Sequence, residues 1–187
     1  MADKIILGFV GQIASGKGTA VEYLKTTFGA SSYRFSGMLK DILKRLYLDL
    51  SRENYQTLSQ ALRENFGEDI LARVMAEDVK NDTHDIIAID GVRRPGDVSQ
   101  LTKIPGFVLI HITADIGKRY ERITQREEKV DDKTKTFEEF RTDHMREAEI
   151  KIEEIAAHAH ETVDNNGTIE ELYIQLDALV QRYTKNN

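Results

Sequence analysis

A glycine-rich stretch near the start of the chain has the residue types best suited to chemistry. It reads Gly11-Gln12-Ile13-Ala14-Ser15-Gly16-Lys17-Gly18-Thr19. Glycines let the backbone bend and approach a ligand closely, successive N–H groups of such a loop surround an anion, and a lysine adds a mobile positive charge. The pattern G-x-x-x-x-G-K therefore predicts a loop that binds phosphate groups.

The elements expected on either side of this loop support the prediction. Residues 4–10 are almost wholly apolar, which is typical of a strand buried on both faces of a parallel sheet. Beyond the loop, apolar residues recur at helical spacing up to Phe28, so we expect a helix that begins near Lys17 and points its positive dipole end at the phosphates. The alternative is a chance glycine-rich turn, which the agreement of motif and context disfavours. Where the motif usually has Ser or Thr the chain has Gly18, and Thr19 follows as the hydroxyl expected to serve the phosphates or the hydration shell of Mg²⁺.

The composition narrows the classes of function. The chain has 187 residues, a formal net charge of −6 and a pI near 5.4, which argues against a broad nucleic-acid-binding surface. It has no cysteine, which excludes disulfides, thiol chemistry and cysteine-based zinc sites. No apolar run approaches the length of a membrane span, and no signal sequence is evident. We therefore expect one domain over residues 1–187, cytoplasmic, a monomer or homodimer, with no nucleic-acid or membrane partner.

The rest of the chain alternates between strand and helix patterns. Strands are expected at residues 33–35, 85–90, 107–112 and 161–163. Helices are expected after Ser36 as a cap, at residues 55–66, 70–79 and 97–102, from residue 116, from a Thr136 capping box to about residue 157, and after Thr168. This alternation predicts an α/β fold with a parallel sheet covered on both faces and ligands beyond the carboxyl ends of the strands.

A second polar group stands where the apolar run 85–90 ends. Asp90 closes that run, and Arg93 and Arg94 follow it. In a parallel sheet beside the loop, Asp90 would face the phosphates, where a carboxylate can orient Mg²⁺ directly or through its waters. The two arginines can clamp phosphates by charge-assisted hydrogen bonds. The alternatives are a turn-forming Asp and a solvated pair of arginines.

Arginines also flank a polar, aperiodic segment later in the chain. Arg122 and Arg126 are spaced i,i+4 on the expected helix and therefore share a face. Segment 127–136 follows, and Arg141 and Arg146 lie on the helix after it. This arrangement suits a short lid that closes over phosphates. The alternative is charge pairing with neighbouring glutamates.

These motifs resemble those of P-loop nucleoside monophosphate kinases of the adenylate kinase type. Gly16-Lys17-Gly18-Thr19 is similar to that family's Gly-Lys-Gly-Thr, which accounts for the glycine at position 18. Residues 89–94 resemble its Asp-Gly-Phe-Pro-Arg element, and residues 121–126 resemble the segment that opens its lid. The resemblance implies that Arg94 grips the acceptor phosphate, that Arg122 lies near the donor base and that Arg126 lies near the phosphates.

The resemblance is uneven over the acceptor region. The family's Thr-Gly-Asp-Met-Leu-Arg stands here as Phe-Ser-Gly-Met-Leu-Lys at residues 35–40, so Lys40 replaces the arginine. The pattern from Ser36 to Lys40 is closer to phage-type deoxynucleoside monophosphate kinases and to animal-type phosphomevalonate kinase. Residues 131–140 and 164–167 resemble proteins of the dephospho-CoA kinase-like type. The resemblance thus implies a kinase and leaves the acceptor open.

The resulting hypothesis is a P-loop NTPase fold, a three-layer α/β/α arrangement around a five-stranded parallel sheet, with a helical acceptor-binding insertion at about 36–82 and a lid at about 127–136. The expected activity is transfer of the γ-phosphoryl group of Mg·ATP to a small phosphate monoester, a nucleoside or deoxynucleoside monophosphate. The alternatives are a small-metabolite kinase of the dephospho-CoA or phosphomevalonate type and a nucleotide-binding ATPase switch. The predicted site residues are Lys17, Arg94, Arg122, Arg126, Arg141 and Arg146 for catalysis; Gly11, Gln12, Ile13, Ala14, Ser15, Gly16, Lys17, Gly18, Thr19 and Arg122 for ATP; Ser36, Lys40, Arg93 and Arg94 for the acceptor; and Thr19 and Asp90 for Mg²⁺.

Overall fold

A five-stranded, fully parallel sheet forms the centre of the structure, a computed structural model that describes residues 4–125, 136–144 and 147–185. The strand order is β2-β3-β1-β4-β5. The strands are β1 Ile5–Val10, β2 Ser31–Arg34, β3 Ile86–Asp90, β4 Phe107–Thr113 and β5 Glu161–Asp164. This arrangement confirms the predicted fold class.

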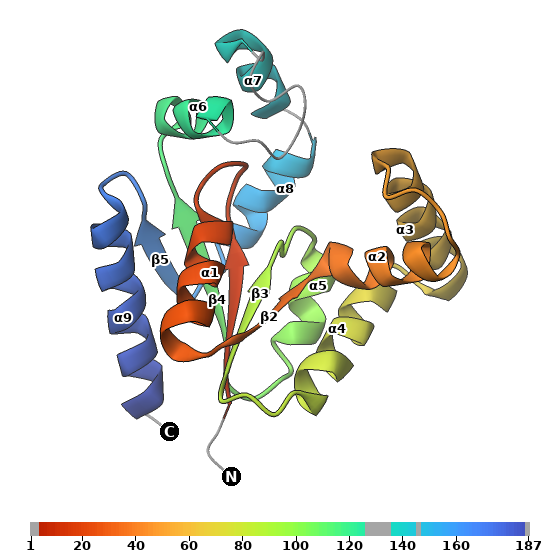
Figure 1. Ribbon diagram of the computed structural model, residues 1–187, viewed down its shortest axis with the longest axis horizontal. Coiled ribbons are helices and arrows are strands. Elements are labelled where there is room, and N and C mark those ends of the chain that lie inside the picture. Colours follow the sequence, from red (N-terminus) through yellow and green to blue (C-terminus); the bar gives the residue numbers. More distant parts are fainter. Residues whose placement is uncertain (1–3, 126–135, 145–146, 186–187) are drawn as a thin grey trace.

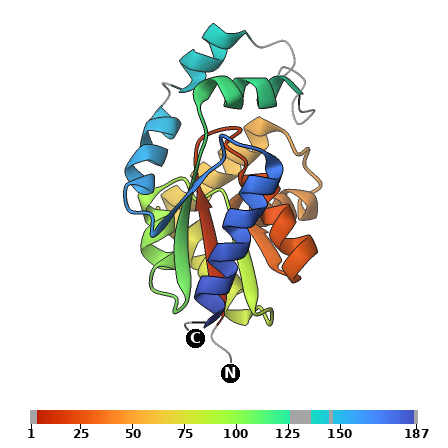
Figure 2. The same cartoon turned by 90° about the vertical axis from the view of Figure 1, so that its left-hand side faces the viewer.

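Helices cover both faces of this sheet, as Figures 1 and 2 show. Helices α1 (Lys17–Phe28) and α9 (Ile169–Lys185) cover one face, and α4 (Ile70–Asn81), α5 (Pro95–Leu101) and α8 (Glu147–Ala156) cover the other. Alternate residues of a strand point to opposite faces, so in β1 Leu7 and Phe9 enter one core cluster while Ile6 and Val10 enter the other. Because the whole of β1 is buried, its end is held firmly where the glycine loop begins.

Two groups of helices project beyond the carboxyl ends of the strands. Helices α2 (Phe35–Arg45) and α3 (Arg52–Phe66), with the connection between them, form an arm at residues 35–66, drawn in orange to brown in Figure 1. Helices α6 (Ile116–Gln125) and α7 (Phe137–His144) lie at the top of the same view. Tyr120 of α6 packs against Phe137 and Phe140 of α7. Residues 127–135 of the expected lid lie outside the described part of the chain, between α6 and α7, and the roles of the arm and the lid stay predictions.

Several element boundaries differ from those expected. Strand β2 ends at Arg34, and Ser36 lies inside α2, whose N-cap is Arg34 without a side-chain cap. The reason is that β2 pairs with β3 up to Arg34 and the helix follows at once, with Phe35 packed against the core. Helix α5 begins two residues early because Pro95 suits the first helical position.

The long helix expected from Thr136 to about residue 157 is described as two helical segments, α7 and α8, and residues 145–146 between them lie outside the described part of the chain. The two helices pack against different partners: α7 contacts α6, whereas Ile152 and Ile155 of α8 enter the core beneath the sheet. The capping box at Thr136 is confirmed, because Glu139 accepts hydrogen bonds from its N–H and hydroxyl. Thr168 and Glu171 likewise cap α9 as expected.

Tyr33 of β2 leads to a prediction about alkaline stability. Its hydroxyl donates a hydrogen bond to Asp82 Oδ2 at 2.7 Å, and burial followed by this bond raises the pKa of Tyr33 from 10.0 to about 12. Below pH 10 the phenol is protonated in the folded and unfolded chains alike. Above pH 10 the unfolded chain loses the proton first, so this group's contribution to stability should fall as the pH rises toward about 12.

Phenylalanine cannot ionise, so the melting temperature of Tyr33→Phe should fall less than that of wild type as the pH rises from 10 to about 12. Circular dichroism melts at a series of pH values measure the difference. Tyr47→Phe, at an 89% exposed tyrosine, is the matched control and should follow wild type. Parallel curves for wild type and Tyr33→Phe would contradict the prediction.

Candidate active site

The glycine loop joins the buried end of β1 to the start of α1 and has the shape of an anion-binding nest. Ala14 and Gly16 adopt left-handed backbone conformations, with φ of 59° and 109°. Such residues turn successive N–H groups toward one point. Inside the loop the Ser15 N–H donates to the Gln12 carbonyl at 3.2 Å, and the first residue of α1 is Lys17. The loop therefore presents backbone donors and a helix N-terminus to the same place.

Lys17 is held within the loop by hydrogen bonds to its backbone. Its side chain is buried, and its Nζ donates to the carbonyl oxygens of Gly11 at 2.6 Å and Gln12 at 2.9 Å. These bonds hold the ammonium group of Lys17 against the backbone of the loop. The following residues, Gly18 and Thr19, are exposed in the first turn of α1.

Asn165, the residue that follows β5, holds the glycine loop in place through a hydrogen bond. Asn165 is 5% exposed, and its Nδ2 donates to the Ser15 carbonyl at 2.7 Å. A Cβ at Gly16 would stand 2.1 Å from that same nitrogen, so only glycine fits there. Arg122 of α6 donates from Nη2 to the Asn165 carbonyl at 2.8 Å, while its Nη1 is buried with no hydrogen-bond partner in the described part of the chain. Arg122 is thus linked to the loop through Asn165, and its predicted role in ATP binding stays a prediction.

The arginine one turn before Arg122 has a structural role that the sequence did not indicate. Arg119 is 2% exposed, donates to the Ala114 carbonyl at 3.0 Å and reaches the Ile13 carbonyl of the loop at 3.4 Å. Its guanidinium also lies 5.7 Å from the ring centre of Phe140. It therefore ties α6, α7 and the glycine loop together.

Asp90 lies at the same edge of the sheet, on the strand beside β1. It pairs with Phe9 of β1 and with Arg34 of β2 in the strand register. Its side chain is nearly buried, and Oδ2 forms an ion pair with Arg34 Nη2 at 2.6 Å. Within the described residues, no group of three or more acidic or histidine side chains could hold a metal ion. A single carboxylate with the Thr19 hydroxyl fits Mg²⁺, which keeps waters and phosphates as most of its ligands.

A second set of contacts, missed at the sequence level, joins the loop to α8. Gln12 Nε2 donates to Glu153 Oε1 at 2.9 Å. His111, at the carboxyl end of β4, is half-buried; burial and then the charge of Lys17 lower its pKa, and Glu153 opposes them. A neutral imidazole adds no further positive charge beside Lys17. Nothing in the local sequence pattern of His111 signals this location.

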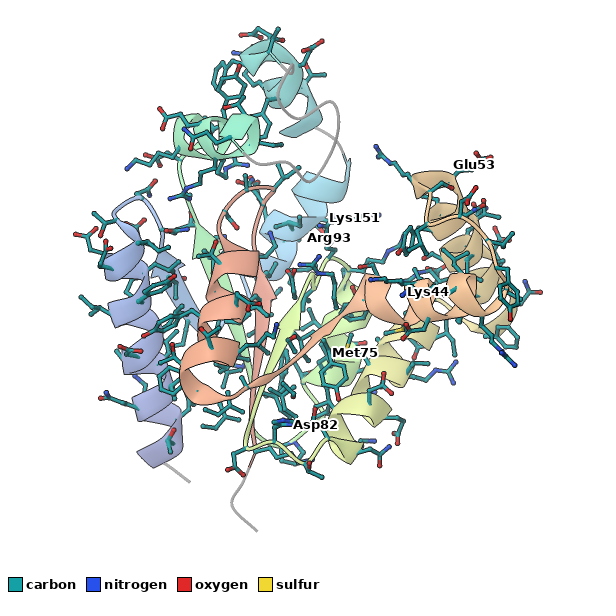
Figure 3. The ribbon with its side chains drawn as sticks, in the orientation of Figure 1. Lys44, Glu53, Met75, Asp82, Arg93 and Lys151 are labelled. Carbon is teal, nitrogen blue, oxygen red and sulfur yellow. The ribbon has the colours of Figure 1, made fainter. Side chains whose placement is uncertain are left out.

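The residues predicted for the acceptor lie on and opposite the arm. Ser36 and Lys40 are exposed on α2. Arg93 and Arg94 are exposed in the turn between β3 and α5, and Figure 3 shows Arg93 between the glycine loop and the arm. The Nη1 of Arg94 lies 3.6 Å from Oε2 of Glu68, a residue of the turn that follows the arm. The turn and the arm therefore approach each other at this point.

The lid arginines are only partly covered by the structure. Arg141 is exposed on α7 and its Nε lies 3.6 Å from Glu138 Oε2, the neighbour pairing weighed as the alternative role. Arg126, Arg146 and most of the predicted lid lie outside the described residues.

No helix among the described residues is long and apolar enough to cross a membrane.

Comparison with known proteins gives relatives without a stated activity. No protein-family model matches the chain. The chain is 27% identical over 183 residues to a UPF0200 protein of Hyperthermus butylicus, covering 98% of this chain and 97% of that protein. It is 28% identical over 185 residues to a UPF0200/UPF0201 protein of Archaeoglobus fulgidus. There the alignment takes in 97% of this chain and 56% of the relative, so the chain spans about half the length of that protein.

Among the solved structures with a similar fold are two kinases that act on small molecules. A shikimate kinase from Bacteroides thetaiotaomicron superimposes with a TM-score of 0.64 at 11% identity, over 95% of this chain and 97% of that one. A gluconokinase from Sinorhizobium meliloti gives a TM-score of 0.60 at 12% identity, over 99% and 95% of the two chains. The chain therefore has the fold of small-molecule P-loop kinases.

Proposed function

We propose that this protein transfers the γ-phosphoryl group of Mg·ATP to a phosphate monoester, a nucleoside or deoxynucleoside monophosphate. One observation carries the proposal: three features lie at the same edge of the sheet. They are the glycine loop with Lys17, the carboxylate of Asp90 and the turn that bears Arg94. A phosphate-binding nest alone would suit any nucleotide-binding protein. The exposed Arg93 and Arg94, which follow the strand that ends in Asp90, favour a second, anionic substrate.

Each residue has a distinct part in this proposal. The loop N–H groups and Lys17 bind the donor phosphates, and Arg122 flanks the donor from α6. Asp90 and Thr19 would hold Mg²⁺, which when bound neutralises charge on the donor phosphates. Arg34 must then loosen its 2.6 Å ion pair with Asp90 or share that carboxylate. In this proposal Asp90 and its neighbours position Mg²⁺ and balance the charge around it.

The chemistry asked of the protein is modest. The bond between the γ-phosphorus and its bridging oxygen breaks, the acceptor oxygen forms a new bond to that phosphorus, and ADP leaves. An oxygen of a phosphate monoester is already anionic at neutral pH, so no general base is needed. The rate then depends on alignment and on charge neutralisation by Lys17, Lys40, Arg94 and the arginines of α6, α7 and the lid. Closure over the site would exclude water as a competing acceptor.

An acceptor-dependent ADP-release assay tests the proposal. The full chain is incubated with Mg·ATP and a panel of nucleoside and deoxynucleoside monophosphates, other phosphate monoesters and hydroxyl-bearing metabolites. ADP release that requires a nucleoside monophosphate supports the proposal. Slow release that no acceptor stimulates would favour an ATPase switch instead.

A second candidate is a kinase for a small non-nucleotide metabolite. It is favoured by the structural neighbours, whose names are shikimate kinase and gluconokinase. A hydroxyl acceptor would need a general base at the reacting oxygen, and Asp90, which pairs in register with Phe9 of β1, is the candidate for that base. A pH–rate profile with a rising acidic limb would separate this candidate from one whose acceptor is already ionised.

Removing the predicted acceptor cations gives a prediction on kinetics. Arg94→Ala and Lys40→Ala should each raise the acceptor KM and lower kcat, because a phosphate clamp aids both binding and alignment. The KM for ATP should barely change, since Lys17 and the loop bind the donor. Steady-state kinetics with the best acceptor from the panel measure all three constants. Unchanged acceptor constants in both variants would place the acceptor pocket elsewhere.

A further inference from the structure

An arginine and an aspartate buried beneath the acceptor side of the site have no part in the roles described above. Arg63 of α3 is 7% exposed and Asp97 of α5 is 3% exposed. The Nη2 of Arg63 lies 3.9 Å from Oδ1 of Asp97. Charged groups are costly to bury, so a buried pair that joins two helices beside the predicted acceptor residues calls for a specific use. This pair joins the arm to the helix that follows the Arg93–Arg94 turn.

Asp97 holds the backbone of that turn. Its Oδ2 accepts hydrogen bonds from the N–H groups of Arg93 at 3.2 Å and Arg94 at 3.1 Å. Burial raises the pKa of Asp97, while these two N–H groups and the nearby arginines oppose the rise. The carboxylate therefore fixes the backbone from which the Arg94 side chain leaves.

Arg63 is also linked to the guanidinium group of Arg94, through Glu68. Its Nη1 donates to the Glu68 carbonyl, and the Glu68 carboxylate stands 3.6 Å from the Arg94 guanidinium. Burial and then the positive charge of Arg94 lower the pKa of Arg63, which is consistent with the two guanidinium groups being close. The backbone and the guanidinium of Arg94 are thus both linked to Arg63, one through Asp97 and the other through Glu68.

The pair also has unused hydrogen-bonding capacity. Asp97 Oδ1 and Arg63 Nε are both buried and have no hydrogen-bond partner in the described part of the chain. Buried polar atoms without partners are costly. A buried contact kept at such a cost is better explained by a role at the site than by a gain in stability.

We propose that Asp97 and Arg63 are positioning residues for Arg94, which they orient toward the acceptor phosphate and couple to the position of the arm. The link to the acceptor rests on the proposed function. The link to Arg94 rests on the contacts alone and is tested separately. Neither residue touches the reacting atoms.

The test uses Asp97→Asn, Arg63→Met and the double variant. Asp97→Asn keeps an oxygen that can accept the two N–H groups. The double variant removes both charges, so neither is left buried alone if Arg63→Met proves unstable. Arg73→Met is the matched control: Arg73 also lies beside the arm, pairs with an aspartate and donates to the Phe66 carbonyl, but it is half exposed and outside the Arg94 contacts.

Two measurements are expected to change together. The acceptor kcat/KM should fall roughly ten- to a hundredfold, the range expected when a substrate-aligning group is misplaced by about 1 Å, with the KM for ATP unchanged. The Nε–H signal of Arg94 in the NMR spectrum of the ligand-free protein, assigned by its loss in Arg94→Ala, should shift in all three variants. Arg73→Met should alter neither quantity.

The outcomes separate this inference from the proposed function. If the double variant keeps the Arg94 signal and the acceptor constants of wild type, Asp97 and Arg63 do not position Arg94. If the Arg94 signal shifts while wild type phosphorylates no acceptor, the positioning role stands and the proposed kinase activity fails. Partial recovery of kcat/KM in Arg63→Lys, which restores the charge but not the two-pronged guanidinium, would further support the role.

Discussion

Replacing Lys17 with alanine should lower kcat/KM for phosphotransfer by at least about a hundredfold, the usual cost of removing a group that stabilises transition-state charge. Lys17 is the first residue of α1, and its Nζ donates a hydrogen bond to the Gly11 carbonyl of the loop. No neighbouring side chain in the loop carries a charge that could replace it. The same assay that defines the best acceptor measures the loss.

Lys25→Ala is the matched control for this variant. Lys25 lies in the last turn of the same helix, is exposed and forms an ion pair with Glu22 three residues earlier. It should retain wild-type turnover. Because the Lys17 ammonium also holds the carbonyls of Gly11 and Gln12, the melting temperature of Lys17→Ala must be measured alongside. A folded Lys17→Ala protein with near wild-type turnover would exclude the phosphate-loop assignment.

Gly16→Ala should have the largest effect on stability and ATP binding together. Gly16 has a φ of 109°, which side-chain-bearing residues rarely adopt, and its added Cβ would stand 2.1 Å from Asn165 Nδ2. The Asn165 side chain cannot simply swing away without losing its 2.7 Å bond to the Ser15 carbonyl. We expect a loss of roughly 1–3 kcal/mol in the free energy of unfolding, the usual cost of a strained backbone position, and loss of the stabilisation that ATP gives wild type.

Gly18→Ala separates conformational strain from the simple removal of a glycine. A Cβ at Gly18 meets nothing within 4 Å, and the residue lies in the first turn of α1. Alanine there should leave stability unchanged or raise it by up to about 1 kcal/mol. Chemical denaturation of the two variants measures the difference. Equal stabilities would show that the left-handed turn at Gly16 is not required.

The predictable part of this molecule is the part encoded locally. Residues 4–19 contain the strand, the loop and the start of the helix in one continuous run, and the structure has all three in that order. Thr136 and Thr168 cap their helices through glutamates three residues on, a contact that lies within the sequence pattern itself. Strand β3 was predicted nearly to its boundaries because it is apolar up to the terminal Asp90.

The contacts that shape the site were not predictable, because they join distant parts of the chain. Asn165 meets Ser15 across 150 positions, and Glu153 meets Gln12 across 141. Arg34 meets Asp90 only because the sheet order places β2 beside β3. A sequence pattern shows which residues share a helix face, but it does not show which strand will lie next to which. The same limit applies to the pair of Arg63 and Asp97.

The position of β1 has a consequence for how the protein is made. β1 is synthesised before the other four strands, yet it lies in the middle of the sheet, with β3 on one side and β4 on the other. Its partners begin only at Ile86 and Phe107. At ribosomal speeds of about 5–20 residues per second, a wholly apolar strand waits several seconds without its hydrogen-bonding neighbours. Newly made chains truncated before residue 107 should therefore be prone to aggregate or to bind chaperones, and the glycine loop should acquire its phosphate-binding shape only after β4 has been added.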